Sequence, residues 1–327
     1  MYFSSSIFHF FVWQVLISFA SLLTLAILLH RFLPGKFRLF KISFNSIRSV
    51  WKFSGGMLGF AVLSALFLQF DKLMLSHWGS LGSLGYYLLA GTAANILFLI
   101  SVPVTQAIYP RLVRLASSIN PFDQIILYRK ATQLLVVLTS SVAIIFLYYS
   151  SGVIYLWSGN SQLLEQVAPL LSILVVGSLF NSLSYLPYQL QIARGQIKGI
   201  FKIYLVIVLL FITFIIFVIP EYGVMGAAWV WLLVNGMYFF VVTNFTHKNF
   251  LSNLSLNWLV EDMLLPVFGA LLVAFLAHYF QPQAYNNRLS WALFLGFTGI
   301  LTLFLSTLCT KLLRNELFKV ARINKNE

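Results

Sequence analysis

The chain is divided almost from end to end into apolar runs that are about as long as a membrane is thick. A helix needs about 20 apolar residues to cross the hydrocarbon core of a bilayer. Only 9% of the 327 residues are charged, whereas soluble domains carry about a quarter, so lipid must cover most of the surface. The runs of crossing length are residues 7–31, 53–77, 85–110, 131–156, 167–191, 202–220, 223–244, 259–280 and 290–310. We therefore predict an all-α polytopic membrane helical bundle with about nine transmembrane helices.

Two of these runs are separated by a very short connection. Residues 202–220 end at Pro220, and residues 223–244 begin at Gly223. A proline and a glycine on either side of a carboxylate, here Glu221, are typical of a tight turn. We therefore predict two helices that form a hairpin instead of one very long helix.

The basic residues predict how the runs are oriented. If the runs alternate in direction, nineteen of the twenty-one lysine and arginine residues fall on one side of the membrane. Arg288 falls on the other side and Lys72 lies within a run. The positive-inside rule makes the basic side cytoplasmic. This predicts a multi-pass protein of a bacterial cytoplasmic membrane with a cytoplasmic C-terminus and an external N-terminus, which suggests that preceding helices are absent from the chain.

Residues near the predicted membrane surfaces support this orientation. Residues 43–52 mix basic and apolar positions, which fits either an amphipathic helix on the membrane surface or a plain basic loop. Tryptophan is enriched at membrane interfaces, so we expect it at the boundaries of the runs. The tryptophans at these boundaries are Trp51 and Trp258 on the inner side and Trp78, Trp157 and Trp291 on the outer side.

Residue patterns that indicate catalysis, metals or nucleic acid are missing from the sequence. The one cysteine and the five histidines show no ligand spacing, so we expect no metal and no cofactor. The adjacent acids Glu261 and Asp262 fall at the start of a predicted helix, where the helix dipole favours negative charge. The basic residues lie in short loops, which does not predict a nucleic-acid groove. We therefore predict a protein that is not an enzyme.

One acid and one base lie next to each other inside an apolar run. Asp71 and Lys72 are the only charged residues between Lys52 and Arg111, and a charge within a span is costly unless it has a partner or water. Asp71 could bind a proton or a sodium ion that drives transport, or it could pair with Lys72 near the outer interface. Residues at i and i+1 point away from each other on a helix, which argues against a direct pair.

Polar residues recur at helical spacing in three of the runs. Such residues either join helices by hydrogen bonds or line a hydrated cavity. A single residue favours the first interpretation, whereas the whole set with Gln69 and Asp71 favours a cavity. The recurring residues, most of them polar or helix-perturbing, are Thr92, Asn95, Leu99, Pro103 and Gln106 in the third run, Ser178, Asn181, Ser184, Tyr185 and Tyr188 in the fifth, and Asn235 and Tyr238 in the seventh.

Four segments carry a resemblance to a known family. Residues 69–75, 84–90 and 103–112 resemble the opening hairpin of the second lobe of Wzx-type polysaccharide and O-antigen flippases. Residues 221–228 are similar to the turn before the last helix of that lobe. These flippases belong to the multidrug/oligosaccharidyl-lipid/polysaccharide superfamily, whose members have two pseudo-repeated lobes around a central cavity.

The resemblance implies an organisation and a function. Residues 1–52 would hold the last helix of the first lobe and a basic linker, residues 53–244 the six-helix second lobe, residues 245–310 two additional transmembrane helices, and residues 311–327 a basic cytoplasmic tail. The implied function is to flip an undecaprenyl-pyrophosphate-linked oligosaccharide across the cytoplasmic membrane. Roughly five helices of the first lobe would be missing, so the chain alone would supply one complete lobe.

Residues inside the second lobe are the candidates for contact with the substrate. They are Gln69, Asp71, Lys72, Tyr86, Tyr87, Asn95, Gln106, Asn181, Tyr185 and Tyr188, with Asp71 also the candidate for a coupling ion. The expected partners are the lipid-linked oligosaccharide, membrane lipids, a polysaccharide polymerase or glycosyltransferases, and the missing N-terminal half. The alternatives are a multidrug or small-solute exporter of the same superfamily, an integral membrane glycosyltransferase or polymerase, and an assembly partner without transport activity.

Overall fold

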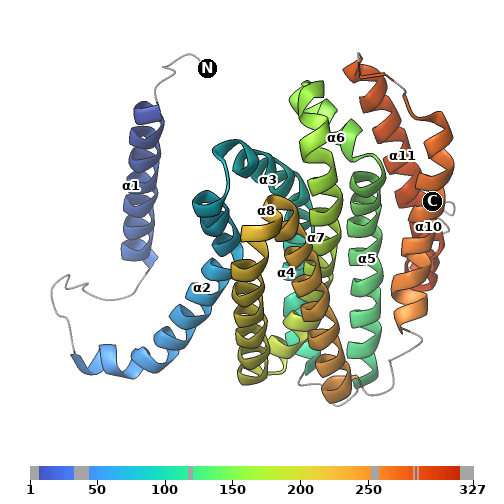
Figure 1. Ribbon diagram of the computed structural model, residues 1–327. Coiled ribbons are helices and arrows are strands. Elements are labelled where there is room, and N and C mark those ends of the chain that lie inside the picture. The colour runs from blue at the N-terminus through green and yellow to red at the C-terminus, as the bar shows by residue number, and fades with distance from the viewer. Residues whose placement is uncertain are drawn as a thin grey trace. The chain divides into compact units, whose positions relative to one another are not determined.

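The computed structural model describes residues 7–32, 44–116, 121–251, 258–282, 284–285 and 287–316. Every element in these ranges is a helix (Figure 1). Eight of the described helical stretches are long and apolar enough to cross a membrane. This confirms the prediction of an all-α polytopic membrane bundle.

The chain forms two units, Met1–Leu58 and Gly59–Glu327. The first unit contains helix α1 (Ile7–Phe32) and the beginning of helix α2 (Phe44–Trp78). With 26 residues, α1 is about 39 Å long at 1.5 Å per residue, which is enough to span a bilayer. Residues 44–52 are helical, so the alternative of a plain basic loop is wrong for them. A position of this segment on the membrane surface stays a prediction.

The second unit contains the remaining helices. Three short helical turns, η1 (Ser161–Leu163), η2 (Trp258–Leu264, a π-helix) and η3 (His278–Phe280), lie beside the longer ones. The longer helices that follow α2 are α3 (Leu81–Ala94), α4 (Ile96–Ala116), α5 (Pro121–Tyr148), α6 (Ser150–Ser158), α7 (Leu164–Ala193), α8 (Ile197–Phe250), α10 (Leu265–Ala277) and α11 (Arg288–Leu308).

Helix α8 folds back on itself, as the turn residues predict. Gly223 has φ 54° and ψ −137°, a conformation outside the helical region that glycine adopts without steric cost. The two arms lie against each other, since the ring centroids of Tyr204 and Tyr238 are 5.9 Å apart and those of Phe211 and Trp231 are 6.3 Å apart. Figure 1 shows the two arms running in opposite directions. They correspond to the two expected runs 202–220 and 223–244.

Two other expected spans are interrupted. The run 85–110 is divided at Asn95, which caps the end of α3 before α4 begins. The run 131–156 is divided at Tyr149, whose φ of −119° and ψ of 33° end α5 before α6 begins. Neither break falls on a proline or glycine, the residues that usually mark an interruption in a helix.

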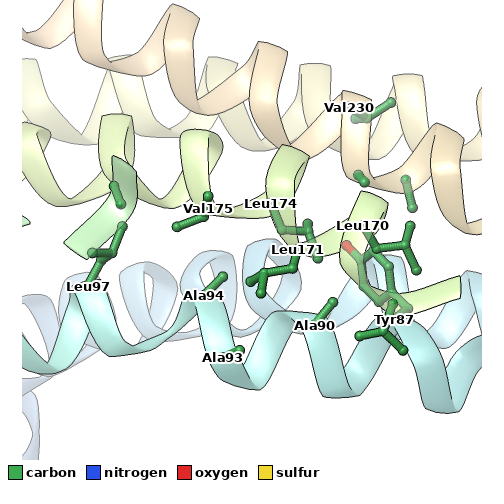
Figure 2. Packing of buried hydrophobic residues seen from close by; sticks show 14 of the residues in the cluster. Tyr87, Ala90, Ala93, Ala94, Leu97, Leu170, Leu171, Leu174, Val175 and Val230 are labelled. Atoms are coloured by element: carbon green, nitrogen blue, oxygen red, sulfur yellow. The ribbon is translucent and has the colours of Figure 1, made fainter. Parts of the chain in front are cut away.

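Helix α7 lies at the centre of the second unit and contacts α3, α4, α5, α6 and α8. Figure 2 shows Ala90 and Ala94 of α3 facing Leu171 and Leu174 of α7. These alanines are almost completely buried. Small residues let two helix backbones approach closely, and in lipid such close packing is a main source of helix association.

The last two transmembrane helices are joined to this core by a buried ion pair. Asp262 of η2 is fully buried, and Arg129 of α5 binds both of its oxygens, with Nε–Oδ2 2.6 Å and Nη2–Oδ1 2.9 Å. Arg129 Nη2 also contacts Glu261 Oε2 at 2.7 Å, and Gln133 donates to Asp262 Oδ1 at 2.6 Å. The helix dipole was the expected reason for these acids, but their main partner is Arg129.

Two of the tryptophans expected at the membrane interface are buried within the protein, and their depth in a membrane stays a prediction. Trp258 is 3% exposed and its ring packs on His247, with centroids 4.5 Å apart. Trp291 is 2% exposed and packs against Gly152 of α6, where a Cβ atom would lie 2.1 Å from the indole ring. Trp78 and Trp157 are exposed, as expected for residues at a lipid interface. The side chain of Trp51 lies outside the described part of the structure.

Candidate functional site

A cavity of about 290 Å³ lies inside the second unit. Residues of α2, α4, α7 and both arms of α8 form its wall, together with Asn95 at the junction of α3 and α4. Aromatic rings, hydroxyls and amides dominate the lining, and none of the described residues that line it is charged. The lining residues are Phe60, Ser64, Phe67, Leu68, Asn95, Phe98, Ser178, Asn181, Ser182, Ser184, Tyr185, Tyr188, Tyr204, Trp231 and Tyr238.

Aromatic rings from α2 and both arms of α8 form one continuous group in this wall. The ring of Tyr204 on α8 stacks on Phe60 of α2 with centroids 5.0 Å apart, and it contacts Phe67 at 5.9 Å. Phe67 in turn contacts Trp231 of the other α8 arm at 5.4 Å. Such ring contacts hold the aromatic faces in fixed positions. The wall therefore combines rigid rings with phenol hydroxyls, as on Tyr204, that can donate or accept hydrogen bonds.

Amide and hydroxyl groups join α7 to α8 at the same cavity. Asn181 Nδ2 donates to Asn235 Oδ1 at 2.7 Å, and Asn235 Nδ2 donates to the Trp231 carbonyl at 2.8 Å. The indole N–H of Trp231 donates to Ser178 Oγ at 3.3 Å. Asn181 and Ser178 therefore join helices and line the cavity at once, so the two interpretations of these polar residues do not exclude each other.

A second cavity of about 200 Å³ lies beside the first and contains Asp71. The two cavities share Leu68, Asn95, Ser178 and Trp231 as lining residues. Since a shared set of residues lines both, the two cavities adjoin each other. The second one differs by its charge, because Asp71 and Lys72 both lie in its wall.

Asp71 is 2% exposed and is held by several donors. The Tyr87 hydroxyl donates to its Oδ2 at 2.7 Å, and the backbone N–H of Lys72 donates to its Oδ1 at 2.8 Å. Lys72 Nζ lies 3.3 Å from Asp71 Oδ1 and also donates to the Leu68 carbonyl. The sequence argument against a direct pair is therefore wrong. The long lysine side chain folds back along the helix and reaches its neighbour, although the two Cβ atoms point apart.

Eight of the ten candidate residues lie in the two cavities. Tyr86 is half-buried and packs on the hydrophobic core, and Gln106 is exposed on α4; neither lines either cavity. Gln69, Asp71, Lys72, Tyr87 and Asn95 line the second cavity, and Asn95, Asn181, Tyr185 and Tyr188 line the first. Whether these residues contact a substrate stays a prediction.

Several lining residues were not singled out by sequence reasoning. Phe60, Phe67, Tyr204 and Trp231 are aromatic residues in apolar runs, and such residues face lipid as readily as a cavity. The sequence did offer a signal for Tyr204. Tyr238 was expected on a polar face, and the predicted hairpin places Tyr204 on the antiparallel arm opposite to it, as the structure shows.

The described residues contain no group of three or more histidine, cysteine, aspartate and glutamate side chains that could hold a metal ion. The second cavity offers one carboxylate, one ammonium group and one phenol. A carboxylate beside a hydrated cavity can exchange a proton or bind a monovalent cation, whereas the first cavity offers uncharged hydrogen-bonding groups and ring faces.

The fold and these cavities define a polytopic helical membrane protein with a polar interior.

Residues 5–163 match the family model described as "Polysaccharide biosynthesis protein". The chain is 24% identical over 189 residues to a "Putative O-antigen transporter" of Shigella flexneri, and this match covers 58% of the chain and 44% of that relative. Both matches agree with the resemblance to polysaccharide flippases that the sequence segments carry. The chain thus spans less than half of the curated relative that it matches. A comparison with solved structures found no match to the chain.

Proposed function

We propose that this chain forms one lobe of a flippase that moves an undecaprenyl-pyrophosphate-linked oligosaccharide from the cytoplasmic to the outer leaflet of the cytoplasmic membrane. The observation that carries the proposal is the uncharged aromatic and hydroxyl wall of the first cavity. A glycan is rich in hydroxyls and has apolar ring faces, so phenols and amides can replace its water while aromatic rings cover its faces. Such transport makes and breaks no covalent bond.

The lobe needs a facing partner for this function. Alternating access requires one repeat to move against another around a shared site. The relative named above is called an O-antigen transporter, and the matched region covers 44% of it. We propose that a first lobe, on the same polypeptide or on a separate one, faces the first cavity and completes the passage. Glycosyltransferases and a polysaccharide polymerase would supply and consume the transported oligosaccharide.

Asp71 is the proposed site of coupling to an ion gradient. A carboxylate within a span is retained against a penalty of about 2.5–3.5 kcal/mol. Its position in a cavity that adjoins the first one gives a bound proton or sodium ion a direct route to influence the glycan passage. Lys72 is the competing cation, and its side chain is 35% exposed, so it can leave when another cation binds.

Complementation tests the proposal. A flippase-null strain receives this chain alone, or the chain preceded by five restored first-lobe helices, and surface polysaccharide is measured. We expect the restored protein to export the glycan and the chain alone to fail. Within the restored protein, Tyr204→Ala should reduce export at least about tenfold because it removes the central ring of the aromatic group. Unchanged export with Tyr204→Ala would contradict the proposed passage.

A small-solute exporter of the same superfamily is the second candidate. The first cavity, at about 290 Å³, lies near the lower end of the range for small-molecule pockets. Sensitivity of a strain with the restored protein to lipophilic cations and dyes separates the two functions. A drug exporter would raise resistance without restoring surface polysaccharide, whereas the flippase would do the reverse.

A further inference from the structure

A third pocket, also polar, lies away from the two cavities, where α6, the start of α7 and the segment before α11 meet. Its volume is about 460 Å³. The loops 158–166 and 281–289, from which Glu165 and Tyr285 come, are on the predicted external side of the membrane. The residues that give the pocket its chemistry are Ser150, Ser151, Glu165, Ser172 and Tyr285.

Tyr285 presents an aromatic face that the surrounding residues hold in place. Its ring is parallel to that of Trp291, with an interplanar angle of 3° and centroids 5.2 Å apart. Trp291 is itself buried against Gly152 and donates its indole N–H to the Ala284 carbonyl at 3.2 Å. The rings of Tyr155 and Tyr285 make a T-shaped contact, with centroids 5.5 Å apart and an interplanar angle of 67°. The residue remains 38% exposed, so a fixed ring is available to a ligand at the protein surface.

Polar groups around this ring are available for hydrogen bonds. Within the described part of the chain, the side chains of Ser150, Ser151 and Glu165 have no hydrogen-bond or ion-pair partner. A carboxylate accepts hydrogen bonds only, whereas a serine hydroxyl both donates and accepts. A ligand with many hydroxyls matches this combination, and a phosphate does not, because Glu165 would repel it.

We propose that this pocket is a saccharide-binding site on the external face of the lobe, distinct from the central cavities. A sugar ring would lie against the exposed part of the Tyr285 ring, with its hydroxyls bonded to Glu165 and to Ser150 or Ser151. The negative charge selects the sugar part of a glycolipid over its pyrophosphate. If the proposed flippase function holds, the site receives the glycan after its passage, but saccharide binding at this site does not depend on flipping.

Binding of lipid-free saccharides tests this site. The full chain in lipid nanodiscs is titrated with oligosaccharide repeating units released from bacterial O-antigens, and binding is followed by calorimetry and saturation-transfer NMR. Inorganic pyrophosphate serves as the anionic probe. We expect a saccharide to bind and pyrophosphate not to bind. Tyr285→Ala should weaken saccharide binding at least about fivefold because it removes the aromatic ring, whereas Tyr285→Phe should keep it.

A second variant protects the test against misfolding. Ser151→Trp fills the pocket without removing the ring stack, and it should abolish binding while the thermal unfolding midpoint stays unchanged. Unaltered binding in both Tyr285→Ala and Ser151→Trp would overturn the proposal, as would the absence of binding by every saccharide tested. Loss of binding in Tyr204→Ala alone would assign the saccharide to the central cavity, which overturns the external site and leaves the proposed flippase function intact. Failed complementation, together with saccharide binding that depends on Tyr285, would overturn the flippase function and leave the external site intact.

Discussion

Two buried aspartates of this protein have different surroundings. Asp262 is fully buried, and Arg129 binds both of its oxygens while Gln133 adds a third hydrogen bond. Asp71 is 2% exposed, but the one cation that pairs with it among the described residues is Lys72 at 3.3 Å, whose side chain is 35% exposed, and it borders a cavity of about 200 Å³. A buried charge with rigid, complete pairing holds helices together, whereas one with an exchangeable cation and adjacent space can change its partner. The first aspartate is structural, and the second is the candidate for function.

The largest effect is expected from breaking the complete pair. Asp262→Ala leaves Arg129 and Gln133 without their main partner, and loss of one member of a buried ion pair costs about 3–5 kcal/mol. Thermal unfolding in detergent should show a correspondingly lower midpoint. Glu261→Ala is the matched control, since the Glu261 side chain is 39% exposed, and it should cost less than about 1 kcal/mol. Equal losses for the two variants would contradict the difference between the acids.

An intermediate effect is expected at the hydrogen bond from Tyr87 to Asp71. Tyr87→Phe removes a 2.7 Å bond to a buried carboxylate, and hydrogen bonds to charged groups contribute about 1.5–3 kcal/mol. Unfolding in detergent would measure this loss. The neighbouring substitution Tyr86→Phe is the control because the Tyr86 side chain lies outside both cavities, and it should change stability by less than about 0.5 kcal/mol. If both substitutions are neutral, the Tyr87 hydroxyl does not stabilise the carboxylate.

The smallest effect on stability, but the largest on transport, is expected from Asp71→Asn. An asparagine oxygen can still accept the Tyr87 hydrogen bond, so the cost to stability should be only about 1 kcal/mol. Loss of the charge removes the proposed ion site, and glycan export by the protein with restored helices should be abolished at normal expression. Asp123→Asn, at the exposed first turn of α5, should leave export unchanged. Undiminished export with Asp71→Asn would remove Asp71 from the mechanism.

Much of the fold could be predicted from the sequence because lipid imposes simple rules on a spanning chain. Apolar runs of about 20 residues must become helices, since every backbone group has to be satisfied within its own segment. The turn at Gly223 was predictable because a proline and a glycine flank a carboxylate there. The interruption at Tyr149 was not, since its residue type carries no such signal.

The candidate site was predictable only in part. Polar residues in an apolar run are conspicuous, so Asp71, Asn95 and Asn181 could be named before the structure was known. The aromatic half of the wall could not, because Phe67 in a lipid-facing position and Phe67 in a cavity have the same sequence signal. Tyr86 and Tyr87 show a second limit of prediction from the sequence. Both were candidates, but adjacent residues on a helix face different surroundings, and of the two only Tyr87 contacts Asp71.

The sequence by itself determined that the chain is an all-α polytopic membrane bundle, the approximate positions of its apolar runs, and the presence of an acid beside a base within one of them. These properties depend on composition and on short-range order along the chain. The tertiary structure decided which partner each charge has. Arg129 and Asp262 are 133 residues apart, and their pairing follows from the packing of α5 against η2. It also decided that Asp71 has a neighbouring cavity, because empty space arises only where side chains from several helices fail to fill it.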